Sequence, residues 1–255
     1  MTTTNNQIQI KILGTQSPYC KENSAGPSYL IIYKNTKILL DCGSGSHRFF
    51  DCNNLDNLHI LISHLHYDHF VDLYTYMYSA YAFKNLNKIN KPIEVYIPTY
   101  PSSIYSEIKN INENFCNFND IEEYKKYNIN GIDIDFCKVQ HANFVDNYAI
   151  RLKVDGKTIV YSGDASFSAQ PYLTKFVKDA DLFICEASLL KEHNFPEICN
   201  HLTASQGATI AKEANVKKLI ITHFWPEEKT EKYLLEAKAV FKNTFIAKEK
   251  DIYTI

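Results

Sequence analysis

ISHLHYDHF, residues 62–70, places three histidines and one aspartate within six positions, directly after an apolar, strand-like run. In an extended segment, residues i and i+2 point the same way, so His64 and His66 face a common point while Leu65 turns into the core. Asp68 and His69 then begin the following helix and face a neighbouring point. Three imidazoles and one carboxylate at this spacing, H-x-H-x-D-H, predict a metal site.

Further ligand-type residues follow other strand-like runs: His141 comes after FCKVQ, Asp164 after IVYSG and His223 after LIIT. Strand ends at one edge of an α/β fold converge on a common rim, where a site can form. None of these groups is a thiolate, which suits Zn, Mn or Fe in an open catalytic site. Because the candidates are too many for one tetrahedral ion, we expect two divalent metal ions that share a carboxylate. The candidate metal ligands are His64, His66, Asp68, His69, His141, Asp164 and His223.

The order of predicted elements favours an α/β fold built from two similar halves. Strand-like runs at residues 8–13, 29–33, 37–41 and 59–63 precede a helix, and runs at 132–139, 148–154, 157–163 and 181–187 repeat that logic. The spacing predicts a helix over 68–83, with Tyr74, Met77, Tyr78 and Tyr81 on its buried face and a substrate-pocket wall or dimer interface as the alternative role of that stripe. It also predicts a helix over 203–214 with Thr203 as its N-cap. No Gly/Ser/Pro-rich linker separates the halves, so we expect one domain over residues 1–255.

Composition excludes several classes of protein. With 29 acidic and 27 basic residues the net charge is -2, so no global positive field holds a polyanion. The polar amino terminus does not resemble a signal peptide, and no apolar run has the length of a membrane span. Seven scattered cysteines without a C-x-x-C pair argue against a disulfide framework and indicate a reducing compartment. We therefore expect a cytoplasmic protein with no membrane partner.

The ordered ligand set, from H64-L-H66-Y-D68-H69 through His141 and Asp164 in SGD to His223, resembles that of the metallo-β-lactamase fold hydrolases. The resemblance implies a four-layer αβ/βα fold, in which two packed mixed β-sheets are flanked by helices. It also implies that His64, His66 and His141 hold one metal, that Asp68, His69 and His223 hold the other, and that Asp164 bridges them. Zinc is the expected metal, with Mn or Fe as alternatives.

A second segment indicates the branch of that superfamily. His201 in CNHLTASQGATIAKEA stands 22 residues before His223, and this part of the chain is similar to the ribonuclease Z-like phosphodiesterases. The resemblance implies that His201 acts on the phosphoryl group or the leaving oxygen, while a metal-bridging hydroxide attacks phosphorus. Glu186 is expected to orient His201, and Asp68 to assist the attacking water as well as to ligate.

The substrate is expected to be smaller than tRNA. The tRNA-processing members with an exosite arm carry it between the third metal histidine and the bridging aspartate, but here only 22 residues separate His141 from Asp164. With the net charge of -2, this favours small phosphodiesters, such as cyclic nucleotides or a short nucleic-acid end, over tRNA. A thioester, lactone or sulfate-ester hydrolase is the alternative, and a non-catalytic metal-binding scaffold is the least favoured. The resemblance also suggests a homodimer.

Overall fold

The computed structural model describes residues 7–111, 116–194 and 199–255, which divide into two compact units. The first unit comprises the chain up to Thr15, residues Tyr19–Ile121 and the closing segment Lys248–Ile255. The second comprises Gln16–Pro18 and Glu122–Ala247. A single domain over residues 1–255 stays a prediction.

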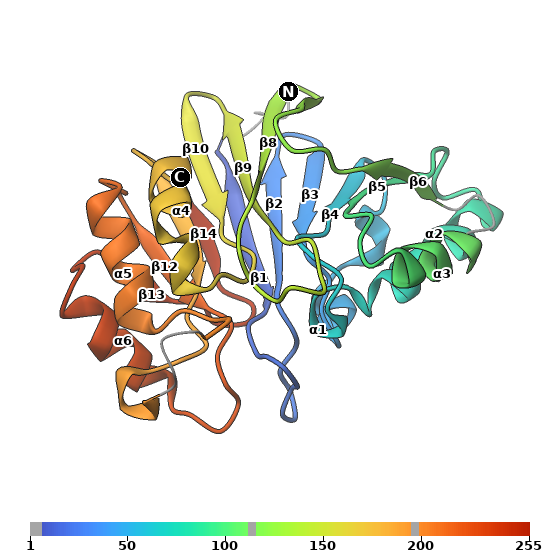
Figure 1. Ribbon diagram of the computed structural model, residues 1–255. Coiled ribbons are helices and arrows are strands. Elements are labelled where there is room, and N and C mark those ends of the chain that lie inside the picture. Colours follow the sequence, from blue (N-terminus) through green and yellow to red (C-terminus); the bar gives the residue numbers. More distant parts are fainter. Residues whose placement is uncertain (1–6, 112–115, 195–198) are drawn as a thin grey trace. The chain divides into compact units, whose positions relative to one another are not determined.

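The first unit contains a seven-stranded mixed sheet in the order β14-β1-β2-β3-β4-β5-β6 (Figure 1). Pairings from β14 to β3 are antiparallel and those from β3 to β6 are parallel. Branched aliphatic residues dominate the central strands, whose side chains are almost entirely buried. The strands are β1 (Gln9–Gly14), β2 (Ser28–Tyr33), β3 (Thr36–Leu40), β4 (Leu58–Leu61), β5 (Ile93–Ile97), β6 (Cys116–Asp120) and β14 (Ile252–Thr254).

The predicted helix over residues 68–83 is divided in the structure. A single turn, α1 (Tyr67–Phe70), ends before α2 (Leu73–Asn85) begins. The backbone N–H of Asp72 donates to the carbonyl of Cys42, 3.1 Å away, and its carboxylate accepts from the backbone N–H of His47 at 2.9 Å. These contacts with the loop after β3 accompany the break at residues 71–72.

The predicted buried face of this helix is also partly wrong. Tyr78 and Tyr81 are exposed, whereas the core side of α2 presents Leu73, Tyr76, Met77 and Ala80. This buried set packs in the core of the first unit together with Ile108 of α3 (Ser102–Ile111) and residues of β4 and β5. Two short 3-10 turns complete the unit, η1 (Ser46–Phe49) and η2 (Cys52–Asn54).

The second unit repeats the pairing pattern of the first. Its seven-stranded sheet has the order β13-β12-β11-β10-β9-β8-β7, antiparallel from β7 to β10 and parallel from β10 to β13. The prediction of two similar halves is therefore confirmed. The strands are β7 (Lys126–Ile129), β8 (Ile132–Lys138), β9 (Tyr148–Val154), β10 (Lys157–Tyr161), β11 (Leu182–Glu186), β12 (Leu219–Thr222) and β13 (Thr244–Ile246).

Helices accompany this sheet too. They are η3 (Phe167–Ala169), α4 (Gln170–Phe176), η4 (Lys191–His193), α5 (Ala204–Glu213) and α6 (Thr230–Lys238). Thr203 caps α5 as predicted, because its hydroxyl accepts from the backbone N–H of Gln206 while the Gln206 side chain bonds back to Thr203. Two mixed sheets with flanking helices confirm the predicted α/β class. Within the described ranges no helix has the length and apolarity to cross a membrane.

Candidate metal centre

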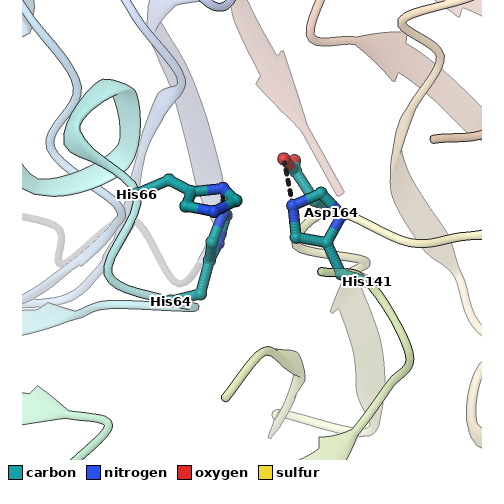
Figure 2. A group of neighbouring side chains, drawn as sticks. All are labelled: His64, His66, His141 and Asp164. Atoms are coloured by element: carbon teal, nitrogen blue, oxygen red, sulfur yellow. Dashed lines mark hydrogen bonds and ion pairs between the residues drawn. The ribbon is translucent and has the colours of Figure 1, made fainter. Parts of the chain in front are cut away.

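His64 and His66 lie just beyond the end of β4 in the first unit. His64 Nε2 is 3.0 Å from His66 Nδ1, and the two ring centroids are 4.6 Å apart. Figure 2 shows the two rings turned toward one another. Zinc–nitrogen bonds of 2.0–2.1 Å at tetrahedral angles place two ligand nitrogens roughly 3.3 Å apart. The two ring nitrogens therefore fit a shared metal ion.

Asp68 and His69 come from α1, one turn after His66, which is the N-cap of that helix. Asp68 Oδ2 lies 3.6 Å from His69 Nε2. A carboxylate oxygen and an imidazole nitrogen at this separation again suit adjacent positions around one ion. The predicted placement of both residues in the first helical turn is confirmed.

The buried carboxylate of Asp41 forms hydrogen bonds with this ligand segment. Asp41, at the end of β3, accepts hydrogen bonds from the backbone N–H and the hydroxyl of Ser63, both at 2.7 Å, and from His69 Nδ1 at 2.8 Å. Its backbone is left-handed, with φ of 55°, an uncommon conformation for a residue with a side chain. Because His69 donates through Nδ1, its Nε2 carries the lone pair that a metal needs.

The ligand candidates of the second unit surround Asp164. His223 Nε2 is 3.1 Å from Asp164 Oδ1, and His141 Nε2 is 3.6 Å from Asp164 Oδ2, the ion pair that Figure 2 marks with a dashed line. His141 Nδ1 donates to the carbonyl of Asn200 at 2.7 Å. Burial lowers the pKa of His141 below the usual 6.5 despite the opposing effect of Asp164. The neutral imidazole, which is the form that binds metals, is thereby favoured.

His201 lies among these groups. Its ring stacks on that of His223, with centroids 5.4 Å apart, and meets the His141 ring edge to face at 5.0 Å. Its Nδ1 is 3.2 Å from Glu186 Oε1 and 3.8 Å from Asp164 Oδ2. The expected contact between Glu186 and His201 is therefore present, while their catalytic roles stay predictions.

Glu186 is a fully buried carboxylate with every oxygen engaged. Oε1 accepts from the backbone N–H groups of Ala165 and Leu202, and Oε2 accepts from the N–H and hydroxyl of Ser188, all within 3.1 Å. Burial opposes its ionisation, but His201 outweighs burial and lowers the pKa of Glu186. For His201, burial lowers the pKa, but Glu186 and then Asp164 overcome it and raise the pKa to about 9.

A pocket of about 810 Å³ opens in the second unit, with His141 in its wall. Two of its lining side chains, Tyr124 and Tyr172, are 86% and 71% exposed, which leaves their rings accessible for stacking. Phe176 and Lys175 of α4 also line it, and Lys175 forms no ion pair with any residue that the structure describes. The volume lies within the range of small-molecule sites, roughly 300–1,000 Å³.

Sequence reasoning overlooked two serines in these networks. Ser63 directly precedes His64, and Ser188 lies two residues after Glu186. Each serine lies within two residues of a predicted site residue at the end of an apolar strand, and that position was the available signal. The hydroxyl partners, however, depend on contacts between distant segments, so spacing alone does not identify them.

Known proteins share both the sequence pattern and the fold. A ribonuclease Z from Protochlamydia amoebophila is 28% identical over 294 aligned positions, covering 94% of this chain and 94% of the relative. The metallo-β-lactamase fold protein YhfI from Bacillus subtilis superposes with a TM-score of 0.88 at 23% identity, covering 98% of this chain and 100% of YhfI. Human tRNase Z, short form (ELAC1), superposes with a TM-score of 0.75 at 19% identity, covering 96% and 98% of the two chains.

These similarities make the chain a metallo-β-lactamase fold protein related to ribonuclease Z, which confirms the resemblance seen in its sequence. More narrowly, a family model described as "Anti-Pycsar protein Apyc1" matches residues 8–248, and the chain belongs to that family. The alignment with ribonuclease Z spans more positions than the 255 residues of this chain, so the relative carries residues that have no counterpart here.

Proposed function

We propose that this chain is a metal-dependent phosphodiesterase of the ribonuclease Z-like type. The observation that carries the proposal is the donor arrangement within each unit, where imidazole nitrogens lie 3.0–3.6 Å from another imidazole or a carboxylate. The relationship to ribonuclease Z supports a metal-dependent hydrolase and a phosphodiester substrate. The thioester, lactone and sulfate-ester alternatives have no comparable support.

The proposed centre would hold two divalent ions, zinc being the favoured metal and Mn or Fe the alternatives. His64, His66 and His141 would hold one ion, and Asp68, His69 and His223 the other. Asp164 would be the shared ligand, an assignment supported by its two oxygens, which face His223 and His141 separately. When bound, such a pair of cations lowers the pKa of water and neutralises charge on the phosphoryl oxygens.

His201 is the proposed general acid for the leaving oxygen. Its Nδ1 is held by Glu186, so the proton to be transferred resides on Nε2. Glu186 acts through His201 as a positioning residue and stabilises the protonated ring. Asp68, 15% exposed at its side chain, combines ligation with orientation of the attacking water.

Small phosphodiesters, such as a cyclic nucleotide or a short nucleic-acid end, are the proposed substrates. The pocket that His141 lines has a volume suited to one nucleotide, and Tyr124 and Tyr172 offer exposed rings against which a base can stack. Lys175 supplies a positive charge to the same lining, which also contains the carboxylate of Glu123. A net charge of -2 gives the chain no general attraction for a long polyanion, so tRNA is not the favoured substrate.

The test is hydrolysis of a chromogenic bis-aryl phosphodiester by metal-stripped protein, reloaded separately with zinc and with manganese. We expect turnover only after reloading and two equivalents of metal per chain, with cyclic nucleotides and a tRNA precursor compared next. Asp164→Asn serves as the matched variant, since it keeps the side-chain shape but loses the bridging charge. Absence of phosphodiester turnover at full metal loading, with turnover of a thioester or lactone, would overturn the assignment.

We also propose a compartment and an oligomeric state for the chain. Among the described residues no two cysteines form a disulfide, which agrees with the reducing cytoplasm. A homodimer is proposed from the resemblance alone, and sedimentation velocity at several protein concentrations tests it.

A further inference from the structure

In the first unit, the Asp41 carboxylate is linked to two candidate metal ligands, directly to His69 and through the Ser63 hydroxyl to His64. We call the link from a carboxylate through a serine hydroxyl to a histidine a relay. Asp41 Oδ2 accepts directly from His69 Nδ1 at 2.8 Å and also from the Ser63 hydroxyl at 2.7 Å. The same hydroxyl oxygen is 3.0 Å from His64 Nδ1. A carboxylate only accepts hydrogen bonds, so the Ser63 hydroxyl donates its single proton to Asp41. The hydroxyl oxygen must therefore accept a hydrogen bond from His64. His64 therefore carries its proton on Nδ1 and its lone pair on Nε2.

The second unit contains the same relay built from other residues. Glu186 accepts directly from His201 and, at 3.0 Å, from the hydroxyl of Ser188. Ser188 Oγ in turn is 2.6 Å from His223 Nδ1. The donor argument is unchanged, so His223 is protonated on Nδ1, and its Nε2 is the atom that lies 3.1 Å from Asp164.

The repeated sheet pattern does not by itself generate this relay. Asp41 and Ser162 occupy matching places after β3 and β10, and each accepts a backbone N–H from the neighbouring parallel strand, from Ser63 at 2.7 Å and from Glu186 at 3.0 Å. The acid and the serine have thus exchanged strands between the units. In the second unit the relay then uses a different serine, Ser188, to reach its histidine.

We propose that Ser63 and Ser188 are positioning residues that fix the tautomers of His64 and His223, so that each ring offers Nε2 to a metal ion. This inference rests on the metal centre of the proposed function. A neutral imidazole has one proton, and a hydroxyl that must accept at Nδ1 selects one tautomer before any metal arrives. Without the hydroxyl, the Nε2-protonated form competes, and it must lose that proton before binding.

The first readout is long-range ¹H–¹⁵N NMR of the histidine rings in metal-free protein at pH 8. We expect the Nδ1-protonated pattern for His64 and His223 in the wild type. Ser63→Ala should shift His64 toward the Nε2-protonated form and leave His223 unchanged, and Ser188→Ala should do the reverse. Nε2 protonation of either ring in the wild type overturns the proposal whether or not the variants fold.

The second readout is zinc affinity, measured by chelator competition. Loss of a group that orients a ligand weakens binding roughly 10–100-fold, and we expect that loss in both alanine variants. Ser188→Thr keeps the hydroxyl and should restore affinity. Ser46→Ala and Ser205→Ala are matched controls, because these buried serines bond to Asp72 and Thr203 outside the relays.

Neither readout uses a substrate. A wrong assignment of the phosphodiester would therefore leave both results interpretable, whereas unchanged tautomers together with unchanged zinc affinity in the folded alanine variants would overturn the relay. Circular dichroism establishes folding of each variant before the affinities are compared.

Discussion

The general-acid role proposed for His201 would distinguish phosphodiester hydrolysis from the other ester chemistries of the fold. We expect His201→Ala to lower kcat for a phosphodiester on the order of a hundredfold or more, because the leaving oxygen loses its proton donor. Zinc stoichiometry should stay at the wild-type value, since His201 is not among the proposed ligands. The measurement is steady-state kinetics alongside metal analysis.

His193→Ala is the control, a partly exposed histidine of the same unit whose Nε2 is 3.3 Å from Glu228. Its kcat should match the wild type. If His201→Ala also keeps full turnover, the general-acid role is wrong and the thioester and lactone substrates gain support.

Tyr172 tests the proposed nucleotide pocket. Base–aromatic stacking contributes about 1–3 kcal/mol, so Tyr172→Ala should raise KM for a cyclic nucleotide about tenfold with little change in kcat. Because its ring is 71% exposed, the substitution should leave the melting temperature nearly unchanged. Tyr78→Ala removes a similarly exposed ring on α2 as a control. A KM increase of equal size for a phosphodiester that lacks a base would contradict stacking.

Only some of the contacts in the candidate ligand networks could be predicted from the sequence. Because His141, Asp164 and His223 each follow a strand, they could be predicted as neighbours. In the structure both histidines lie within 3.6 Å of the Asp164 carboxylate. The contacts of the Ser188 hydroxyl could not be predicted, because they join it to residues 2, 13 and 35 positions away in the sequence. Long-range hydrogen bonds depend on the completed fold and leave no periodic signal.

Among the elements, strands with a regular apolar pattern were predictable and the others were not. The runs that became β2, β3 and β4 are mostly apolar, whereas β6 (CNFND) and β7 (KYNI) lack such a pattern and are held by their neighbours in the sheets. The helix after the histidine cluster was correct in kind, but α2 begins afresh at Leu73, so its buried face differs from a continuous helix over 68–83. Tertiary contacts decided both features.

Asp181 ties together the strands that carry the second unit's site. Its carboxylate accepts from the backbone N–H of Thr158 at 2.9 Å and from Lys217 Nζ at 2.8 Å, which links β10, β11 and the start of β12. Burial raises its pKa, but the bonds from Lys217 and Thr158 outweigh burial, so the pKa lies below the usual 3.8. A depressed carboxyl pKa stabilises the folded chain above the unfolded value and loses that effect as pH falls through the folded value.

Asp181→Asn should therefore lower the melting temperature by a few °C at pH 7. The deficit should be the same at pH 5, since both pKa values lie lower, and should shrink near pH 3. Thermal unfolding followed by circular dichroism at the three pH values measures it. Asp179→Asn is the control, because that neighbouring side chain bonds only to Asn215 among the described residues. A deficit that grows as pH falls would contradict the assigned sign.

For the whole molecule, the net charge and the short interval between His141 and Asp164 both argue against binding of long nucleic acid. Acidic residues outnumber basic ones by 29 to 27, and the interval between His141 and Asp164 is occupied by β9, β10 and their turn. Ribonuclease Z aligns over 294 positions and so carries segments that this chain lacks. With a net charge of -2, the chain therefore has no overall attraction for a long polyanion.

The salt dependence of kcat/KM distinguishes a small phosphodiester substrate from a long nucleic acid. A protein that neutralises 6–10 phosphates loses roughly 10³–10⁵ in affinity between 50 and 200 mM salt, whereas one phosphate contact changes affinity by about threefold. We expect kcat/KM for a cyclic nucleotide to fall by no more than about threefold over this range, and a tRNA precursor to be cleaved far more slowly at 50 mM. Efficient cleavage of the precursor with a steep salt dependence would show that a local basic surface replaces the missing segments, and the substrate assignment would then move to tRNA.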